Sequence, residues 1–329
     1  MQQTVQEALC QTEAPEETDK FYQDVIEGLT SEFKRLPSKY FYDQQGDRIF
    51  QQIMACDQYY LTRCEAEILK NQREQICETI RDGDDSFEII ELGAGDGTKT
   101  VHLLDGLARR GKSFRYLPID ISGNILNELT DNLLAQNPEL DIEPLEGEYF
   151  EMLDQAVSLS ALHKVVMFLG SNIGNMPPED ALQFCTRIRQ SIMPGDMVLI
   201  GFDLVKDPYT IRAAYSDEQG ITNAFNLNLL KRINTELGAD FNLNLFDHYC
   251  SYDPLTGACK SYLVSQRKHT VSFPSAQIHF NEGECIWMEI SQKYSLSQIS
   301  QMALNSGFEP ISTFTDSKGW FADVVWKAV

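Results

Sequence analysis

The stretch Phe87–Thr100, FEIIELGAGDGTKT, joins an apolar run that ends in an acid to three glycines within five residues. Three further apolar runs of strand length follow it, at 116–121, 164–170 and 196–204, and segments of helix length separate them. This alternation predicts βαβ units and a parallel sheet that is buried on both faces. The quoted stretch is therefore predicted to be the first strand of that sheet and the turn after it.

The glycine turn indicates which ligand the sheet binds. Gly93, Gly95 and Gly97 give GxGxG, whereas a dinucleotide fingerprint needs a sixth-position glycine where Thr98 stands, and no Walker GK[ST] follows. Together with Glu91 the pattern is E-x-G-x-G-x-G, the form used to hold S-adenosylmethionine (SAM), whose two ends need close backbone approach without any phosphate contact. A purely structural strand-to-helix turn is the alternative.

Two acidic residues further along favour the SAM interpretation. Asp120 ends the second apolar run, YLPID, which places a carboxylate at the carboxyl edge of the neighbouring strand. A carboxylate there can accept hydrogen bonds from a ribose diol, although a helix N-cap is the alternative role. Glu148, in EGEYFE, follows the presumed third strand and is a candidate for contact with the adenine edge.

Composition excludes several classes of partner. A formal net charge of −22 and a pI of about 4.5 should repel nucleic acid and anionic membrane surfaces. No apolar segment is long enough to span a bilayer, and the first twenty residues lack a secretory pattern. The cysteines are scattered along the chain. Cys250 and Cys259 could meet across a hairpin and form a disulfide, but reduced cysteines in a cytoplasmic protein are the preferred interpretation. The histidines are dispersed, so no metal is expected.

Seven segments occur in an order and spacing that resembles one known family. They are SKYFYDQQGDRIF, DQYYLTRCEAEIL, ELGAGDGTKT, LGSNIGN, DLVKDP, AAYSDEQGITNAFNLNLL and EISQKY. Together they resemble the SAM-dependent histidine Nα-methyltransferases, whose members make trimethylhistidine on the way to ergothioneine. The resemblance extends from about residue 25 to the end of the chain.

The resemblance implies an α/β fold with two domains: a Rossmann-like class I methyltransferase sheet, and a second α+β substrate domain formed by the N-terminal segment and an insertion. The pattern agrees with this plan, because strand-like segments at 261–273 and 277–294 follow two predicted helices joined at Gly220, and the chain ends in a helix and two strands. The expected division is a flexible N-terminus at 1–20, a substrate domain at 21–71 plus 205–292, and a SAM-binding domain at 72–204 plus 293–329.

The resemblance also assigns site residues. Asn175 and Tyr215 are implied to hold the substrate carboxylate and amine and, with Tyr42, to act in catalysis. The hydroxyl groups of Tyr42 and Tyr59 are implied to contact the substrate.

Glu289 and Ser291, two apart on a strand and so on one face, are implied to meet the imidazole. Each residue also has a purely structural alternative. Tyr42 and Tyr59 would then be half-buried core residues, Asn175 would cap a helix near Pro177, and Glu289 would be a solvated residue. The expected cofactor residues are Glu91, Gly93, Ala94, Gly95, Gly97, Lys99, Asp120, Glu148, Tyr149, Gly170 and Ser171.

The expected function is SAM-dependent, in-line methylation of the α-amino nitrogen of a free amino acid, histidine first, with S-adenosylhomocysteine as the other product. Ser261 departs from the family pattern, since a larger apolar residue such as methionine is expected there, and a wider pocket for a tryptophan-like amine is the same-class alternative. A SAM-binding protein without catalysis is the alternative from another class, and an NAD-linked oxidoreductase is opposed by Thr98. The sequence does not determine the oligomeric state, and a monomer is compatible with it.

Overall fold

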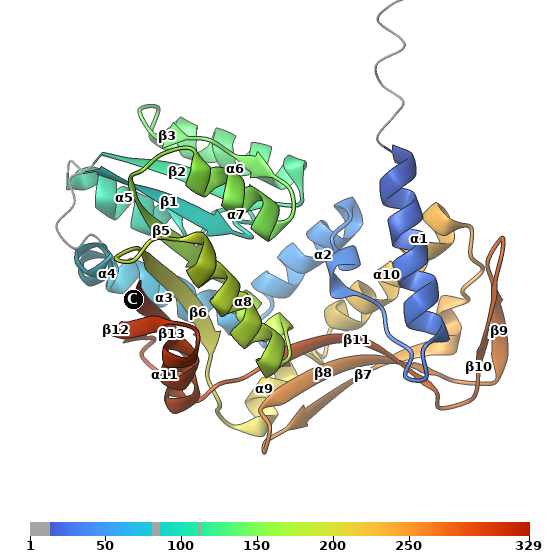
Figure 1. The fold of residues 1–329 in the computed structure, drawn as a ribbon. Helices are drawn as coiled ribbons and strands as arrows, with labels where there is room; N and C mark the ends of the chain where they lie inside the picture. The colour runs from blue at the N-terminus through green and yellow to red at the C-terminus, as the bar shows by residue number, and fades with distance from the viewer. Residues whose placement is uncertain (1–13, 81–85, 111–112) are drawn as a thin grey trace, which may run out of the picture. The chain divides into compact units, whose positions relative to one another are not determined.

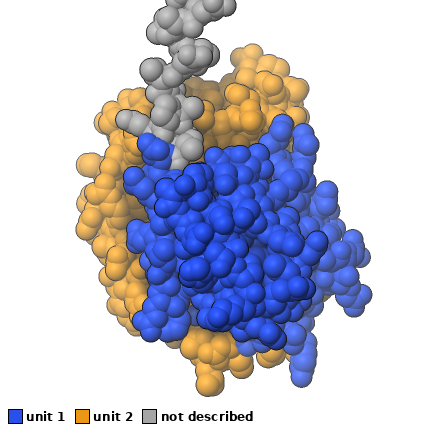
Figure 2. Space-filling view, turned by 90° about the vertical axis from the view of Figure 1, so that its right-hand side faces the viewer, with its two compact units in different colours: residues 1–59, 209–252, 259–289 blue, residues 60–208, 253–258, 290–329 orange. Residues whose placement is uncertain are grey.

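The chain divides into two compact units in a computed structural model that describes residues 14–80, 86–110 and 113–329 (Figure 1). Unit 1 comprises residues 1–59, 209–252 and 259–289, and unit 2 comprises residues 60–208, 253–258 and 290–329. Figure 2 shows the two units in different colours. The sequence pattern placed the first boundary at residue 71, whereas residues 60–71 are part of unit 2 in the structure.

Unit 2 is built on an eight-stranded sheet in the order β12-β13-β6-β5-β1-β2-β3, with β4 also paired to β2. Its strands are β1 (Ser86–Leu92), β2 (Ser113–Asp120), β3 (Asp141–Ile142), β4 (Leu145–Glu146), β5 (His163–Phe168), β6 (Met197–Asp203), β12 (Phe308–Thr315) and β13 (Phe321–Ala328). The four predicted strands are confirmed as β1, β2, β5 and β6, and they pair in parallel. The predicted terminal strands are also confirmed: β13 lies antiparallel between β6 and β12.

This strand order, with one antiparallel strand inserted near the edge, is that of the Rossmann-like class I methyltransferases and confirms the expected fold class. Every residue of β6 is buried, as the apolar run MVLIGF at 197–202 predicts for a central parallel strand. In such sheets ligands bind beyond the carboxyl ends of the parallel strands. A ligand-binding site is therefore expected at the residues that follow β1, β2, β5 and β6.

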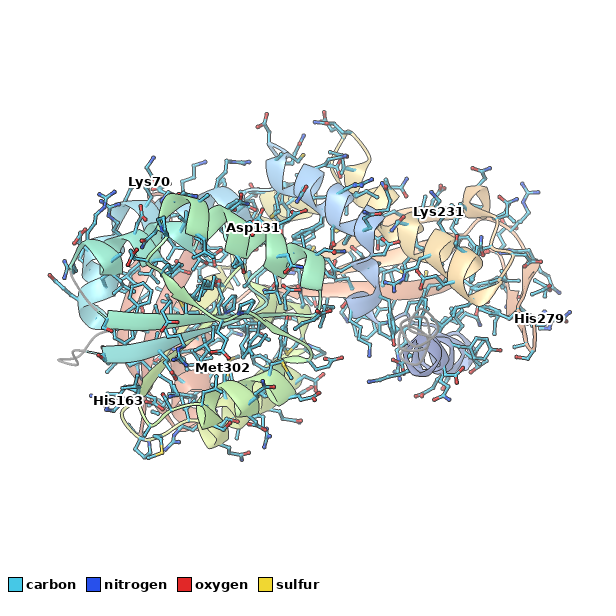
Figure 3. The ribbon with its side chains drawn as sticks, turned by 90° about the horizontal axis from the view of Figure 1, so that it is seen from above. Lys70, Asp131, His163, Lys231, His279 and Met302 are labelled. Carbon is cyan, nitrogen blue, oxygen red and sulfur yellow. The ribbon has the colours of Figure 1, made fainter. Side chains whose placement is uncertain are left out.

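Helices cover both faces of this sheet (Figure 1). The helices of unit 2 are α3 (Leu61–Asn71), α4 (Arg73–Thr79), α5 (Val101–Arg109), α6 (Gly123–Gln136), α7 (Tyr149–Ser158), α8 (Pro178–Ser191) and α11 (Leu296–Asn305), with the 3-10 turn η2 (Asn172–Asn175). Helices α7, α8 and α11 share one apolar core with the sheet, and Met302 of α11, labelled in Figure 3, belongs to it. Helices α3, α4 and α5 contact one another, and α3 and α4 pack on β13 and β12.

Unit 1 combines helices with two small sheets. Its elements are α1 (Ala14–Thr30), η1 (Ser38–Phe41), α2 (Gln44–Ala55), α9 (Pro208–Ala214), α10 (Ile221–Leu237), η3 (Leu243–Leu245), β7 (Phe246–Asp253), β8 (Ala258–Ser265), β9 (His269–Ser272), β10 (Gln277–Phe280) and β11 (Cys285–Gln292). Strands β11, β8 and β7 form one sheet in that order, and β9 pairs with β10 as a hairpin.

Three details of unit 1 differ from the sequence pattern or refine it. Each of the two strand-like segments contains two strands, and β7 was not expected, because FDHYCSYD lacks a continuous apolar run and only half of its residues face inward. Helix α1 begins at Ala14, inside the segment expected to be flexible, while residues 1–13 lie outside the described part of the chain. The sulfur atoms of Cys250 and Cys259 lie 3.5 Å apart and are not joined by a disulfide bond.

Candidate active site

The glycine turn after β1 has the backbone conformation that the sequence pattern demands. Gly93, Gly95 and Gly97 have φ angles of 69°, 56° and 66°, in the left-handed region that side chains with a Cβ atom rarely adopt. A Cβ atom on Gly93 would lie 2.8 Å from the Tyr149 hydroxyl oxygen, whereas one on Gly95 would meet no atom within 4 Å among the described residues. The turn is thus tightly packed on the Tyr149 side, and at Gly95 it leaves bare backbone for a ligand.

Asp120 is tied to this turn. One carboxylate oxygen accepts a hydrogen bond from the Gly95 amide at 3.1 Å, and the other accepts one from the Ser122 amide at 3.0 Å. The N-cap of α6 is Ser122, so Asp120 does not take the capping role that was its alternative. Burial raises the pKa of Asp120 above its usual value, against the lowering effect of these amide hydrogen bonds. A carboxylate has about four acceptor positions, so two bonds leave capacity for a diol.

Glu91, two residues before Gly93, is a buried acid that is hydrogen-bonded to residues of β2 and of the segment after the glycine turn. It is 2% exposed, and it accepts hydrogen bonds from the Thr100 hydroxyl at 2.8 Å and from the Tyr116 hydroxyl at 2.5 Å. Burial raises the pKa of Glu91 to about 7, because the ionised form loses more hydration than the two hydroxyls restore. Glu91 therefore connects β1, β2 and the start of α5 beneath the predicted cofactor loop.

Lys99 is held by a residue that the sequence pattern did not single out. Its ammonium forms an ion pair with Glu65 of α3, whose other oxygen accepts a hydrogen bond from the Gly170 amide at 2.6 Å. Although burial lowers the pKa of Lys99, the charge of Glu65 raises it above the usual value. Glu65 thus links the glycine turn after β1 to the segment after β5. The available signal was an acid on the apolar stripe of a helix, next to the buried residues Leu61, Cys64, Ile68 and Leu69.

Gly170 and Ser171 follow β5 in a strained turn. Gly170 has a φ of 79°, and Ser171, at 60°, is the one non-glycine position of the described chain with a positive φ. The Ser171 hydroxyl oxygen accepts a hydrogen bond from the Asp203 amide at 3.2 Å, which ties this turn to the end of β6. Backbone strain of this kind persists where the surroundings impose it, and it is concentrated at functional sites.

Glu148 and Tyr149 begin α7 beside the turn. Glu148 is the exposed N-cap position and makes no side-chain capping bond. The ring of Tyr149 packs edge-on against Phe168 at 5.7 Å, and burial raises the pKa of its hydroxyl, which therefore stays neutral. Ala94 is buried, and its amide donates to the Ile119 carbonyl at 3.1 Å. The predicted cofactor residues thus lie at the ends of β1 and β2 and on the segments that follow β1, β4 and β5 in unit 2.

The LGSNIGN turn lies against the end of β11 within unit 2. A Cβ atom on Gly174 would come within 2.9 Å of the Gln292 carbonyl oxygen, so only glycine fits there. This contact places Asn175 and Ser291 on chain segments that touch. Asn175 does not cap a helix, because α8 begins at Pro178 with Pro177 as its N-cap.

The predicted tyrosines of unit 1 form one aromatic cluster. Tyr59 and Tyr215 meet with ring centroids 6.0 Å apart, and both are less than a tenth exposed. Phe50 joins Tyr42 at 5.7 Å and Tyr59 at 6.4 Å, and Phe225 lies 5.8 Å from Tyr42. Phe50 and Phe225 were missed, although both stand on apolar helix positions next to predicted site residues. The cluster therefore brings three tyrosine rings, each with a hydroxyl group, together in unit 1.

Strand β11 carries the predicted ring-binding pair. Glu289 and Ser291 are two residues apart on it and therefore project from the same face. The chain passes from unit 1 to unit 2 between them. Ser261, where the family pattern suggested a larger residue, is 3% exposed on β8, the strand next to β11.

The described residues show neither a metal site nor a membrane span. No group of three or more His, Cys, Asp and Glu side chains in residues 14–80, 86–110 and 113–329 could hold a metal ion. His163 and His279, labelled in Figure 3, belong to different units. Of the helices described, none is long and apolar enough to cross a bilayer.

Comparisons with known proteins agree with this geometry. A family described as "Histidine-specific methyltransferase, SAM-dependent" matches residues 21–328. The histidine N-alpha-methyltransferases of Mycobacterium tuberculosis and Mycolicibacterium smegmatis are each 33% identical over 300 residues, which cover 91% of this chain and 92% of each relative. Ergothioneine biosynthesis protein 1 of Neurospora crassa is 30% identical over 86% of this chain, which spans 32% of that longer protein. The chain therefore belongs to the family of SAM-dependent, histidine-specific methyltransferases.

Proposed function

We propose that this protein transfers methyl groups from SAM to the α-amino nitrogen of L-histidine and forms trimethylhistidine. The observation that carries the proposal is the similarity to two histidine N-alpha-methyltransferases along almost their whole length. The glycine turn, Asp120 and Tyr149 support it, because they form a loop edge suited to SAM. SAM, when bound, supplies an electrophilic methyl group that passes in line to a neutral amine, with S-adenosylhomocysteine as product.

The proposal assigns the cofactor to residues of unit 2. Asp120 accepts from the ribose diol, the bare backbone at Gly95 admits the nucleoside, and Glu148 is assigned to the adenine edge. Lys99, Gly170 and Ser171 are assigned to the amino-acid end, where Glu65 and Asp203 hold them in place.

The substrate amine is assigned to neutral groups: Asn175, Tyr215 and Tyr42, with Tyr59 beside them. An α-amino group has a pKa of about 8, so selecting its neutral form at pH 7 costs only about 1.4 kcal/mol and needs no strong base. A carboxylate at the nitrogen would stabilise the protonated form and oppose transfer. Hydroxyl and amide groups orient the lone pair instead, and alignment supplies most of the acceleration.

The imidazole is assigned to Glu289 and Ser291. Glu289 accepts the ring N–H, and a ring without one leaves a carboxylate unmatched, which is costly. The small buried Ser261 favours a second candidate, methylation of a tryptophan-like amine in a wider pocket. We place the protein in the cytoplasm and its product in ergothioneine biosynthesis.

The test is to incubate the purified protein with SAM and a mixture of amino acids and to weigh the products. Histidine that gains three methylene units, with no other amino acid changed, is the expected result. Methylation of tryptophan in its place would favour the second candidate and make Ser261 the residue to change next. Binding of SAM without methylation of any amino acid would overturn the enzymatic proposal.

A further inference from the structure

Lys293 is a fully buried lysine whose ammonium contacts Ser291, a residue predicted to bind the substrate. It is 0% exposed, and its nitrogen lies 2.6 Å from the Ser291 hydroxyl oxygen and 2.8 Å from a carboxylate oxygen of Asp203. The side chain reaches Ser291 because residues two apart in extended chain share a face. Burying an ammonium is costly unless it is paired and hydrogen-bonded, so these two contacts stabilise the lysine in its buried position.

Asp203 is the centre of the network that holds Lys293. Its carboxylate accepts from the Tyr60 hydroxyl at 2.8 Å and forms an ion pair with Lys206, whose pKa burial lowers. The backbone fixes the same segment, since the Tyr294 amide donates to the Asp203 carbonyl at 3.0 Å. The Asp203 carboxylate therefore forms ion pairs with two lysines, Lys206 and Lys293, and of these two Lys293 contacts Ser291. Because Lys206 already balances the charge of Asp203, charge balance alone does not explain why Lys293 is present.

The contact fixes the direction of the Ser291 hydroxyl group. An ammonium has three hydrogens and no acceptor, so at this contact Lys293 donates and the Ser291 oxygen accepts. The single hydroxyl hydrogen of Ser291 must then be donated to a different group. A serine that was not fixed in this way could present either a lone pair or a hydrogen to a ligand.

We propose that Lys293 is a positioning residue that makes Ser291 a hydrogen-bond donor to the substrate ring, so that the enzyme selects a ring with an acceptor nitrogen. This inference rests on the proposed function, in which Ser291 faces the imidazole. Glu289 then takes the ring N–H and Ser291 gives its hydrogen to the other nitrogen, a pairing that neutral imidazole satisfies. An indole has an N–H but no acceptor nitrogen, and would leave the Ser291 hydrogen without a partner.

A double-mutant cycle tests the proposal. Histidine affinity is measured by calorimetry with S-adenosylhomocysteine present, and kcat and KM are measured with SAM, for the parent, Lys293→Met, Ser291→Ala and the double variant. We expect Lys293→Met to weaken histidine binding roughly three- to tenfold, the worth of one hydrogen bond, with a smaller change in kcat. In the Ser291→Ala background the same substitution should cause no further weakening. Unchanged affinity in Lys293→Met, or an equal loss in both backgrounds, would overturn the proposal.

Lys206→Met is the matched control, since it removes a lysine whose side chain is 4% exposed from the same carboxylate and leaves the Lys293–Ser291 contact in place. Its histidine affinity should stay within about twofold of the parent. A loss equal to that of Lys293→Met would assign the effect to the Asp203 network as a whole and contradict the proposal.

A second measurement needs no change at Lys293. The two pyrrolylalanine isomers each keep one ring N–H and carry C–H in place of the acceptor nitrogen. The parent should prefer histidine over both isomers, and Ser291→Ala should lose most of that preference; equal preference in the two proteins would refute the donor role. A parent that neither binds nor methylates histidine would instead overturn the proposed function itself, before any variant is compared.

Discussion

Replacing Glu91 with glutamine should change how the stability of this protein depends on pH. Glu91 is buried, accepts from the Thr100 and Tyr116 hydroxyls, and has a pKa raised from 4.5 to about 7 by burial. Glutamine has nearly the same shape, and each hydroxyl can either donate to or accept from its amide. The substitution therefore removes the titration with little loss of packing.

The sign follows from proton binding. Between pH 4.5 and 7 the folded protein keeps the Glu91 proton, whereas the unfolded chain has released it. The free energy of unfolding of the parent therefore falls as pH rises, by about 1.4 kcal/mol per unit over this window. Between pH 5 and pH 8 the two titration curves give a loss of roughly 2–3 kcal/mol from this one group.

Urea unfolding of the parent and Glu91→Gln at pH 5, 6, 7 and 8 measures this effect. The difference in unfolding free energy between the two proteins should shift in favour of the variant by roughly 2–3 kcal/mol from pH 5 to pH 8. Glu128→Gln, at an exposed position on α6, is the control for exchanging a glutamate for glutamine outside the glycine turn. A difference that does not change with pH for Glu91→Gln would refute the account of a protonated acid at the glycine turn.

Three further predictions concern the substrate amine, the glycine turn and Asp323, a buried acid on β13. Tyr215→Phe should lower kcat/KM for histidine roughly tenfold by removing a hydroxyl at the amine, while Tyr209→Phe, a fully comparable change at an 82% exposed tyrosine of α9, should not. Gly93→Ala should raise the Kd for SAM at least about tenfold, by strain at φ 69° and contact with Tyr149, whereas Gly319→Ala, at φ 66° in open space, should leave SAM calorimetry unchanged. Asp323→Asn should raise the unfolding free energy by about 1–3 kcal/mol above pH 7, and by less at pH 5. The reason is that burial raises the pKa of Asp323 well above its usual value, and neither carboxylate oxygen has a hydrogen-bond partner in the part of the chain described; equal thermal midpoints of the two proteins at pH 8 would contradict it.

The sheet of unit 2 could be predicted because its signals are local. A central parallel strand is buried on both faces, so it appears in the sequence as a continuous apolar run, as at 196–204. The glycines of the first turn have the left-handed φ angles that glycine tolerates. The edge strand β7 lacked such a signal, because its inward-facing residues alternate with exposed ones and form no continuous apolar run. Which residues suit such a strand depends on the side chains of the neighbouring strand.

The residues that support the site were harder to predict than those assigned to the ligand. The glycine turn and Asp120 stand at strand ends, where a motif can be recognised. Glu65 contacts Lys99 across 34 positions of sequence, and Asp203 contacts Lys293 across 90, so no periodicity connects the partners. A buried charge is stable only when its partner arrives from elsewhere in the fold, and the sequence shows only that an acid interrupts an apolar pattern.

Both buried carboxylates lie where two chain segments of the predicted site must be held together. The Glu65 carboxylate joins Lys99, after β1, to Gly170, after β5. The Asp203 carboxylate pairs with Lys293, which donates to Ser291, while the backbone amide of Asp203 donates to the Ser171 hydroxyl oxygen. A transfer that depends on alignment loses rate steeply when reacting groups shift by even an ångström. Buried ionic networks contribute little net stability, but removing one partner leaves an unpaired charge, so alternative arrangements of these turns are costly. On this reasoning the two carboxylates restrict the geometry of the turns, and replacing either one should impair folding as well as methyl transfer, because it leaves buried lysine charge without its partner.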